Sequence, residues 1–197
     1  MIRIIMVRHF ATYGNVQKRY VGRTDEPVIE NRERENMISD PKKISALKEV
    51  KAVYCSPMLR CLQTAEFLFP EMELEKVSDF RECDFGAFEY KNYEELKDEP
   101  SYQKWMDSNG KLPFPGGESR EQFQKRCREA FDQVRMQALE ENLDTIALVI
   151  HGGTIMSILD AYSDPHKDYY AWQTGNGNGY VMESKDNGRL GHICMLR

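Results

Sequence analysis

The sequence predicts an α/β fold with three layers, α/β/α, in which helices cover both faces of a mainly parallel sheet. Short apolar runs rich in β-branched residues lie at 2–7, 52–55 and 145–150, and segments with helical spacing separate them. Runs of this length are typical of buried strands, and their alternation with helices is typical of a parallel sheet. With 197 residues, 41% of them hydrophobic, the chain is expected to form one domain over 1–197.

Helix signals follow two of the predicted strands. Ser56 and Pro57 come directly after the second strand, and Ser is a favourable N-cap while Pro is a favourable first helical residue. A helix is therefore predicted to begin there and to end before Pro70. After the third strand, "HGGTIMSILDAY" predicts a tight glycine-rich turn and another helix, and Asn187-Gly188 predicts a C-terminal hairpin.

A longer helix is predicted from 118 to about 141. Its apolar residues recur every three or four positions and form one face: Phe123, Cys127, Phe131, Val134 and Ala138. Two other segments are less regular. The stretch 80–117 is dense in charged and aromatic residues and is interpreted as a small helical lid excursion. Around Pro41 the first helix is expected to be short or irregular.

Composition excludes several classes of protein. The formal net charge is −5 and the Lys and Arg residues are scattered, which argues against a nucleic-acid partner. No apolar run approaches the roughly 18 residues of a membrane span, and the five cysteines do not suggest a disulfide framework or a zinc site. We expect a cytoplasmic protein with no membrane partner, no cofactor and no metal; a homodimer is left open.

Basic residues stand where two predicted strands end and where a helix begins. Arg8 and His9 end the first strand, His151 follows the third, and Arg60 lies in the first turn of the helix after the second. The carboxyl ends of parallel strands meet at one edge of a sheet, where ligands bind. Two guanidiniums, two imidazoles and backbone amides at helix starts would form an anion pocket suited to phosphate.

The chain resembles the histidine phosphatase (phosphoglycerate mutase-like) superfamily. The matching pieces are "VRHFATYGN", "YCSPMLRCLQTAEFL", "RECDFGAFEYKNYEEL", "PFPGGES" and "VIHGGT", in the family's order along residues 1 to about 160. The resemblance implies that His9 is the nucleophile, which accepts the phosphoryl group on one ring nitrogen while a hydrogen bond to the other fixes the tautomer. Arg8, Arg60 and His151 would hold the phosphoryl oxygens, and Glu82 would protonate the leaving oxygen.

The resemblance also implies that the pocket is lined by Thr12, Asn15, Gly22 and Gly152. Taken singly, Arg60 is equally compatible with an exposed helix residue, Glu82 with a surface carboxylate and His151 with the cap of a turn. Four further residues are expected to be structural: Glu118 and Ser119 at a helix start, and His166 and His192, which match no motif.

Two positions depart from the family pattern. Phe10 stands where glycine is usual after the catalytic histidine, so its backbone must avoid strongly positive φ and its ring is expected to narrow the pocket. Tyr90 stands where many members have glycine.

The predicted activity is that of a metal-independent phosphatase acting on a small phosphomonoester. The resemblance is nearest to the α-ribazole phosphatase and phosphoglycerate mutase-like phosphatases, so an α-ribazole-phosphate-like or sugar or glycerate phosphate substrate is implied. Two alternatives stay open: a phosphoglycerate mutase, which the short chain disfavours, and a non-catalytic phosphate-binding module, which the presence of both His9 and Glu82 disfavours.

Overall fold

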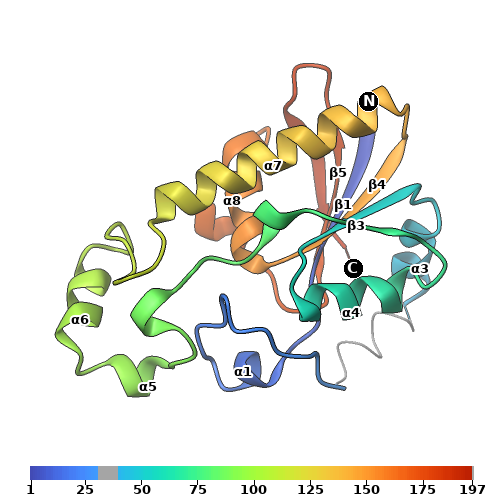
Figure 1. Ribbon diagram of the computed structural model, residues 1–197. Helices are drawn as coiled ribbons and strands as arrows, with labels where there is room; N and C mark the ends of the chain where they lie inside the picture. The colour runs from blue at the N-terminus through green and yellow to red at the C-terminus, as the bar shows by residue number, and fades with distance from the viewer. Residues whose placement is uncertain (31–39, 197) are drawn as a thin grey trace.

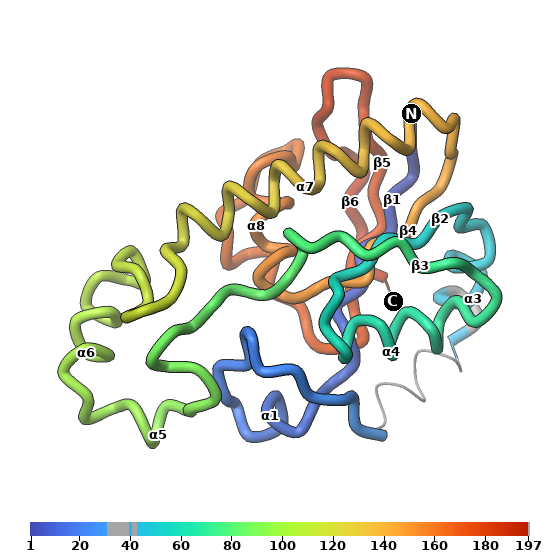
Figure 2. Tube along the Cα trace, in the orientation of Figure 1, coloured from blue at the N-terminus to red at the C-terminus, as the bar shows by residue number. Residues whose placement is uncertain are grey.

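The computed structural model describes residues 1–30 and 40–196 (Figure 1, Figure 2). Its strands form one six-stranded sheet in the order β3-β2-β4-β1-β5-β6. The strands are β1 (Ile2–Arg8), β2 (Ala52–Cys55), β3 (Leu74–Lys76), β4 (Thr145–Ile150), β5 (Gly179–Ser184) and β6 (Leu190–Met195). The four strands from β3 to β1 pair in parallel, whereas β5 and β6 pair antiparallel. The mainly parallel sheet and the C-terminal hairpin are confirmed, with Gly188 at φ +79° in the turn.

Helices cover both faces of the sheet, as predicted (Figure 1). Side chains alternate along β1: Ile4 and Met6 join a core with α7 and α8, whereas Ile5 and Val7 face α3 and α4. The helices are α1 (Tyr13–Val16), α3 (Pro41–Leu47), α4 (Leu59–Leu68), α5 (Tyr93–Leu96), α6 (Pro100–Asp107), α7 (Arg120–Glu140) and α8 (Gly152–Tyr162). The short 3-10 helices are η1 (Ser78–Phe80), η2 (Gly86–Phe88) and η3 (Tyr169–Trp172).

The helix after β2 begins two residues later than the Ser56-Pro57 signal predicts, at Leu59. Asp25 supplies the cap, because its Oδ1 accepts a hydrogen bond from the backbone N of Leu59 at 2.7 Å, and this partner is distant in sequence. Ser56 is instead turned toward His151. The predicted end is correct, since α4 stops at Leu68, before Pro70.

The other helix predictions hold with small shifts at the ends. Ser119 is the N-cap of α7, and the expected apolar face of this helix is buried. Pro41 is the first residue of α3, a short helix of seven residues; the positions 31–39, which belong to the same predicted segment, lie outside the described residues. No helix in the described ranges is long and apolar enough to cross a bilayer.

The excursion between β3 and α7 carries its own small core. It contains η1, η2, α5 and α6 (Figure 1), and its aromatic side chains pack together into a cluster separate from the two cores of the sheet. The buried members are Cys83, Phe88, Leu96, Tyr102, Phe114, Phe123 and Cys127. Glu82, near the start of the excursion, reaches the backbone N of Gly153 in α8.

Candidate active site

Three neighbouring strands place the predicted residues at one edge of the sheet. β2, β4 and β1 are adjacent and run in the same direction. The residues that directly follow them are Ser56, His151 and His9. The crevice beyond the carboxyl ends of such strands is where open α/β sheets bind ligands.

His9 is held as a neutral imidazole with one nitrogen available. Its backbone N donates to the carbonyl of Ile150 at 3.0 Å, and its ring Nδ1 lies 2.7 Å from the carbonyl oxygen of Phe10. A carbonyl only accepts, so Nδ1 carries the proton and Nε2 carries the lone pair. Burial, followed by the charges of Arg60 and Arg8, lowers the pKa of His9 well below its usual value.

His151 lies beside His9 as the N-cap residue of α8. The two ring centroids are 5.2 Å apart, with one edge toward the other's face. His151 Nε2 lies 2.8 Å from the Ser56 hydroxyl oxygen. Burial lowers the pKa of His151 as well, and the Arg60 charge adds to this effect. Both imidazoles are therefore uncharged in the free protein.

Arg60 is fully buried next to both histidines. Its guanidinium donates to the carbonyls of Thr24 at 2.9 Å, Gly22 at 2.8 Å and Val21 at 3.3 Å. Its Nε has no hydrogen-bond partner among the described residues. A buried cation of this kind is costly unless other groups bind it, so the segment 21–24 and a bound anion are complementary partners for it.

Glu89 holds the same segment from the other side. Its Oε1 accepts from the backbone N of Gly22 and of Thr24, both at 2.9 Å. A Cβ at Gly22 would lie 2.1 Å from the carbonyl oxygen of Cys83, so only glycine fits there. Gly22 lines a second cavity of about 430 Å³, which Glu82 also lines.

Arg8 reaches over the start of α8. Its Nη1 donates to the carbonyl of Thr174 at 2.6 Å, and a Cβ at Gly152 would lie 3.3 Å from its Nε. Gly177 N donates to the carbonyl of Arg8, and Asn178 O accepts from its amide. The segment 174–178 thus holds both the side chain and the backbone of Arg8.

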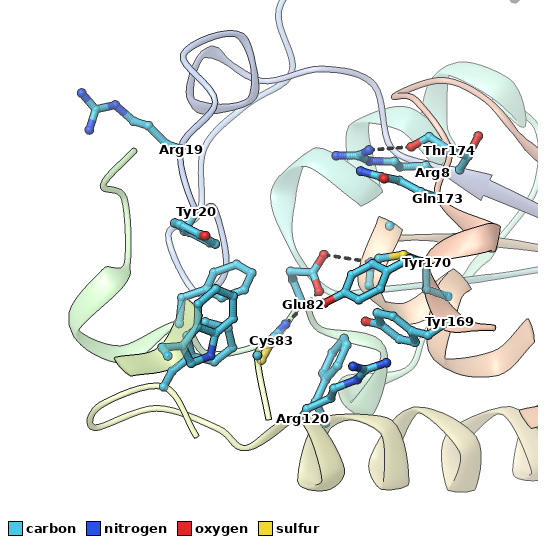
Figure 3. A pocket seen from close by; sticks show the side chains of 18 residues that line it. Arg8, Arg19, Tyr20, Glu82, Cys83, Arg120, Tyr169, Tyr170, Gln173 and Thr174 are labelled. Carbon is cyan, nitrogen blue, oxygen red and sulfur yellow. Dashed lines mark hydrogen bonds between the residues drawn. The ribbon is translucent and has the colours of Figure 1, made fainter. Parts of the chain in front are cut away.

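Glu82 projects from the excursion to the N-terminus of α8 (Figure 3). Its two carboxylate oxygens accept from Cys83 N at 2.9 Å and Gly153 N at 3.3 Å. A Cβ at Gly153 would lie 2.4 Å from Glu82 Oε1. The glycine pair after His151 therefore lets two charged side chains, Arg8 and Glu82, approach the same helix start.

Thr12 and Asn15 order the backbone around His9. They form the capping box of α1, and Asn15 Oδ1 also accepts from Asn176 Nδ2 at 3.1 Å. The same amide donates to the carbonyl of His9 at 3.0 Å. Neither Thr12 nor Asn15 lines the two cavities that adjoin Glu82.

A cavity of about 480 Å³ opens over Arg8, Glu82 and Gly152. It brings together three of the predicted site residues, whereas His9, Arg60 and His151 are buried and do not line it. Aromatic side chains line much of it: Tyr20, Phe85, Trp105, Phe114, Phe123, Tyr169 and Tyr170.

Sequence reasoning missed the part of the site that comes from the C-terminal third of the chain. Tyr169, Tyr170, Gln173 and Thr174 line the cavity, and Arg120 joins them from α7. The glycine- and asparagine-rich run "TGNGNG" before the last hairpin was the available signal, because such runs mark places where the backbone approaches other groups closely.

The two departures from the family pattern have different outcomes. Phe10 does not narrow the cavity: it is fully buried and its ring packs against Phe67, with centroids 5.6 Å apart. Tyr90 adopts a positive φ of 60°, a conformation that favours glycine. Its hydroxyl donates to Glu26 Oε2 at 3.0 Å, which gives the tyrosine a tertiary contact that glycine could not make.

The residues expected to be structural lie outside the cavity. Ser119 caps α7, and Glu118 pairs with Arg126. His166 lies 3.5 Å from Asp160, and the exposed His192 lies 2.6 Å from Glu183.

Comparison with known proteins establishes the class to which this fold and site belong. The model of the histidine phosphatase superfamily (branch 1) matches residues 4–191. The chain therefore belongs to the histidine phosphatase superfamily. Phosphoserine phosphatase 1 of Hydrogenobacter thermophilus is 25% identical over 155 residues, which cover 77% of this chain and 71% of that protein. Two other curated relatives, from Hydrogenobacter thermophilus and Homo sapiens, are matched over only 55% and 18% of their lengths.

Solved structures share the whole fold. A phosphoserine phosphatase of Entamoeba histolytica in complex with phosphoserine has a TM-score of 0.77 at 22% identity, covering 98% of this chain and 96% of that one. The α-ribazole phosphatase of Shigella flexneri has a TM-score of 0.74 at 18% identity, covering 94% and 92%. At these identities the likeness shows the fold.

Proposed function

We propose that this protein hydrolyses small phosphomonoesters through a phosphohistidine at His9. The observation that carries the proposal is the hydrogen bond from His9 Nδ1 to the carbonyl of Phe10. It leaves Nε2 unprotonated beside a group of basic side chains, Arg8, Arg60 and His151. A neutral imidazole beside two cations is suited to attack a phosphoryl group, and membership of the histidine phosphatase superfamily supports this activity.

In the first step, the lone pair of His9 Nε2 forms a bond to phosphorus while the ester P–O bond breaks. Glu82 donates a proton to the leaving oxygen, so the alcohol departs neutral. The two arginines and His151 hold the three remaining phosphoryl oxygens, because the charge on these oxygens is redistributed in the transition state. This step conserves charge within the pocket.

In the second step, water attacks the phosphorus and the P–N bond breaks. Glu82, now a carboxylate, takes a proton from the water, and inorganic phosphate leaves. His9 returns to its neutral form, and Glu82 is protonated again for the next turnover. The free Nε of Arg60 and the backbone amides at the start of α8 are the groups that we expect to reach the phosphoryl oxygens.

The substrate is a small phosphorylated molecule, and the names of similar proteins suggest phosphoserine and α-ribazole phosphate among the compounds to test. A cytoplasmic location is part of this proposal and is supported by five free cysteines.

The proposal is tested by measuring turnover of p-nitrophenyl phosphate and trapping the intermediate. Native protein incubated with labelled substrate and quenched in base should retain one acid-labile phosphoryl group. His9→Ala should lose both the label and turnover, whereas His166→Ala, which removes an exposed histidine, should keep both. Turnover by His9→Ala, or loss of native activity on addition of EDTA, would contradict the proposal.

A further inference from the structure

The cavity over Glu82 has two separate aromatic walls. One wall comes from the excursion and the segment after α1, where Tyr20, Phe85, Trp105 and Phe114 pack edge to face or tilted with centroids 5.0–6.4 Å apart. The other wall is Tyr169 and Tyr170 of η3, with centroids 5.1 Å apart. Figure 3 shows Glu82 between Tyr20 and the tyrosine pair. A group bound next to Glu82 would therefore lie between aromatic rings.

Most of the rings that line the cavity are partly exposed, in addition to packing against one another. Phe114 and Phe123 are buried, but Tyr20, Phe85, Trp105 and Tyr169 are partly exposed and Tyr170 is 60% exposed. Rings that stay partly exposed around a cavity offer apolar area that a ligand can cover.

Two buried polar groups on the lining residues have no hydrogen-bond partner in the described part of the chain. They are the indole Nε1 of Trp105 and the hydroxyl Oγ1 of Thr174. Groups of this kind cost free energy unless something binds them. Both residues line the cavity, but because these two atoms are themselves buried, they do not face it and add no polar contact for a ligand.

The charged residues that line the cavity can be assigned partners without a second charged group on the ligand. Arg8 and Glu82 serve the phosphoryl group and the leaving oxygen in the proposed function. Arg19 is already bound by Glu95 and points away from the other labelled side chains in Figure 3. The guanidinium of Arg120 lies 4.2 Å from the ring centroid of Tyr169, in a cation–π contact.

We infer that the preferred substrates are phosphomonoesters of alcohols that carry a flat aromatic group, and that this group binds between the two aromatic walls. The inference rests on the proposed function and adds the substrate class to it. The volume of about 480 Å³ is in the range of pockets for ring-bearing ligands. Edge-to-face contacts with the walls and stacking on Arg120 favour an aromatic ring over a saturated one of similar size.

The inference is tested with a matched series of alkyl esters: ethyl, 2-phenylethyl and 2-cyclohexylethyl phosphate, with phosphoserine and 3-phosphoglycerate as small acidic competitors. Their leaving groups all need a proton, so kcat/KM reports mainly on the side chain. We expect 2-phenylethyl phosphate to exceed ethyl phosphate and both acidic esters by at least about tenfold, and the cyclohexyl ester by about threefold.

Substitutions of tyrosines test which part of the cavity causes the preference for the phenylethyl ester. Tyr170→Ala should reduce the ratio of kcat/KM for 2-phenylethyl over ethyl phosphate by about threefold or more, and Tyr170→Phe should restore it. Tyr93→Ala removes another exposed tyrosine of the chain that does not line the cavity, and it should leave the ratio unchanged.

Binding to His9→Ala, measured by calorimetry, gives a readout that does not need turnover. The phenylethyl ester should bind the His9→Ala variant more tightly than the ethyl ester does. Preference for phosphoserine or 3-phosphoglycerate, lost in Arg120→Ala, would identify an acid-binding cavity and overturn the inference. Equal rates for all esters would also overturn it while leaving the proposed function intact, whereas failure of every ester to form the phosphohistidine would contradict the proposed function itself.

Discussion

Arg126 and Glu118 form a bidentate ion pair next to the backbone of Glu82. Arg126 Nε lies 2.7 Å from Glu118 Oε1, and Nη2 lies 2.8 Å from Oε2. Arg126 also donates to the carbonyls of Asp79, Arg81 and Glu82. Burial opposes ionisation of Glu118, but its hydrogen bonds to Arg126 and the charge of Arg126 outweigh burial and lower the pKa of Glu118. The pair therefore fixes the chain segment that carries the proposed acid.

Arg126→Met is expected to impair both folding and catalysis. It leaves a partly buried carboxylate unpaired and three carbonyls without a donor, which should lower the free energy of unfolding by about 2 to 4 kcal/mol. Because the backbone of Glu82 then loses its support, kcat for 2-phenylethyl phosphate should fall more than kcat for p-nitrophenyl phosphate. Urea unfolding and steady-state kinetics measure the two effects.

Lys125→Met is the matched control, since Lys125 forms an exposed pair with Glu129 on the same helix. Its effects on both measurements should be small. If Arg126→Met lost stability and kcat fell by the same factor for both substrates, Arg126 would have a structural role only. It would then take no part in positioning Glu82.

Sequence reasoning predicted the sheet and the histidines at its edge because these depend on local signals. A β-branched run that ends in Arg8-His9, and another that ends in His151, identify strand ends without knowledge of the rest of the chain. The contacts of Arg60 could not be predicted in the same way. The carbonyls that it binds lie 36 to 39 residues away, and no periodicity links them.

The start of α4 and the walls of the cavity illustrate the same limit. Asp25 caps this helix from 34 residues away, so the local signal at Ser56-Pro57 placed the boundary too early. Tyr169 and Tyr170 meet the excursion only through tertiary packing. The site residues that lie next to strand ends were thus predictable, whereas those supplied by loops from the C-terminal third were not.

Stability is expected to fall as the solution becomes more acidic than the usual pKa of histidine. His9 and His151 have folded-state pKa values well below 6.5, mainly because they are buried. The unfolded chain therefore binds protons first as pH falls, and the native state loses stability between about pH 6.5 and the lower folded-state values. Each histidine contributes at most about 1.4 kcal/mol per pH unit.

Urea unfolding at several pH values between about 7.5 and 5.5 measures this slope. His9→Gln should make the slope shallower, because one of the two buried groups no longer titrates. A slope that is the same in the native protein and in His9→Gln would show that His9 does not couple folding to pH.

Gly153→Ala tests whether Glu82 must touch the start of α8. The added Cβ would lie 2.4 Å from Glu82 Oε1 and 3.0 Å from the Phe123 ring, so the carboxylate must move. We expect kcat for 2-phenylethyl phosphate to fall by about tenfold or more, since a displaced acid transfers a proton poorly. Gly191→Ala is the control, because its Cβ would meet only the flexible side chain of Lys185. Normal turnover of the alkyl ester by Gly153→Ala would contradict the proposed position of the acid.

Glu82→Gln separates proton donation from phosphoryl binding. An alkoxide is a poor leaving group and needs a proton, whereas p-nitrophenolate leaves readily without one. Both substrates used for this comparison, 2-phenylethyl and p-nitrophenyl phosphate, carry an aromatic ring, so they use the same cavity. The variant should lower kcat for the alkyl ester by about 10² to 10⁴-fold, the range for loss of a general acid, and lower kcat for the aryl ester far less.

His9→Ala provides the contrast, because loss of the nucleophile should stop both substrates alike. The side-chain amide of Gln keeps the size of Glu82, but its single oxygen can accept a hydrogen bond from only one of Cys83 N and Gly153 N. The p-nitrophenyl ester therefore also serves as the control for any local displacement. If Glu82→Gln slowed the two esters by the same factor, Glu82 would act by positioning the substrate. The proton would then have to come from another carboxyl group of the excursion, and Asp84, which lines the second cavity beside Glu82, would be the first to test by the same pair of substrates.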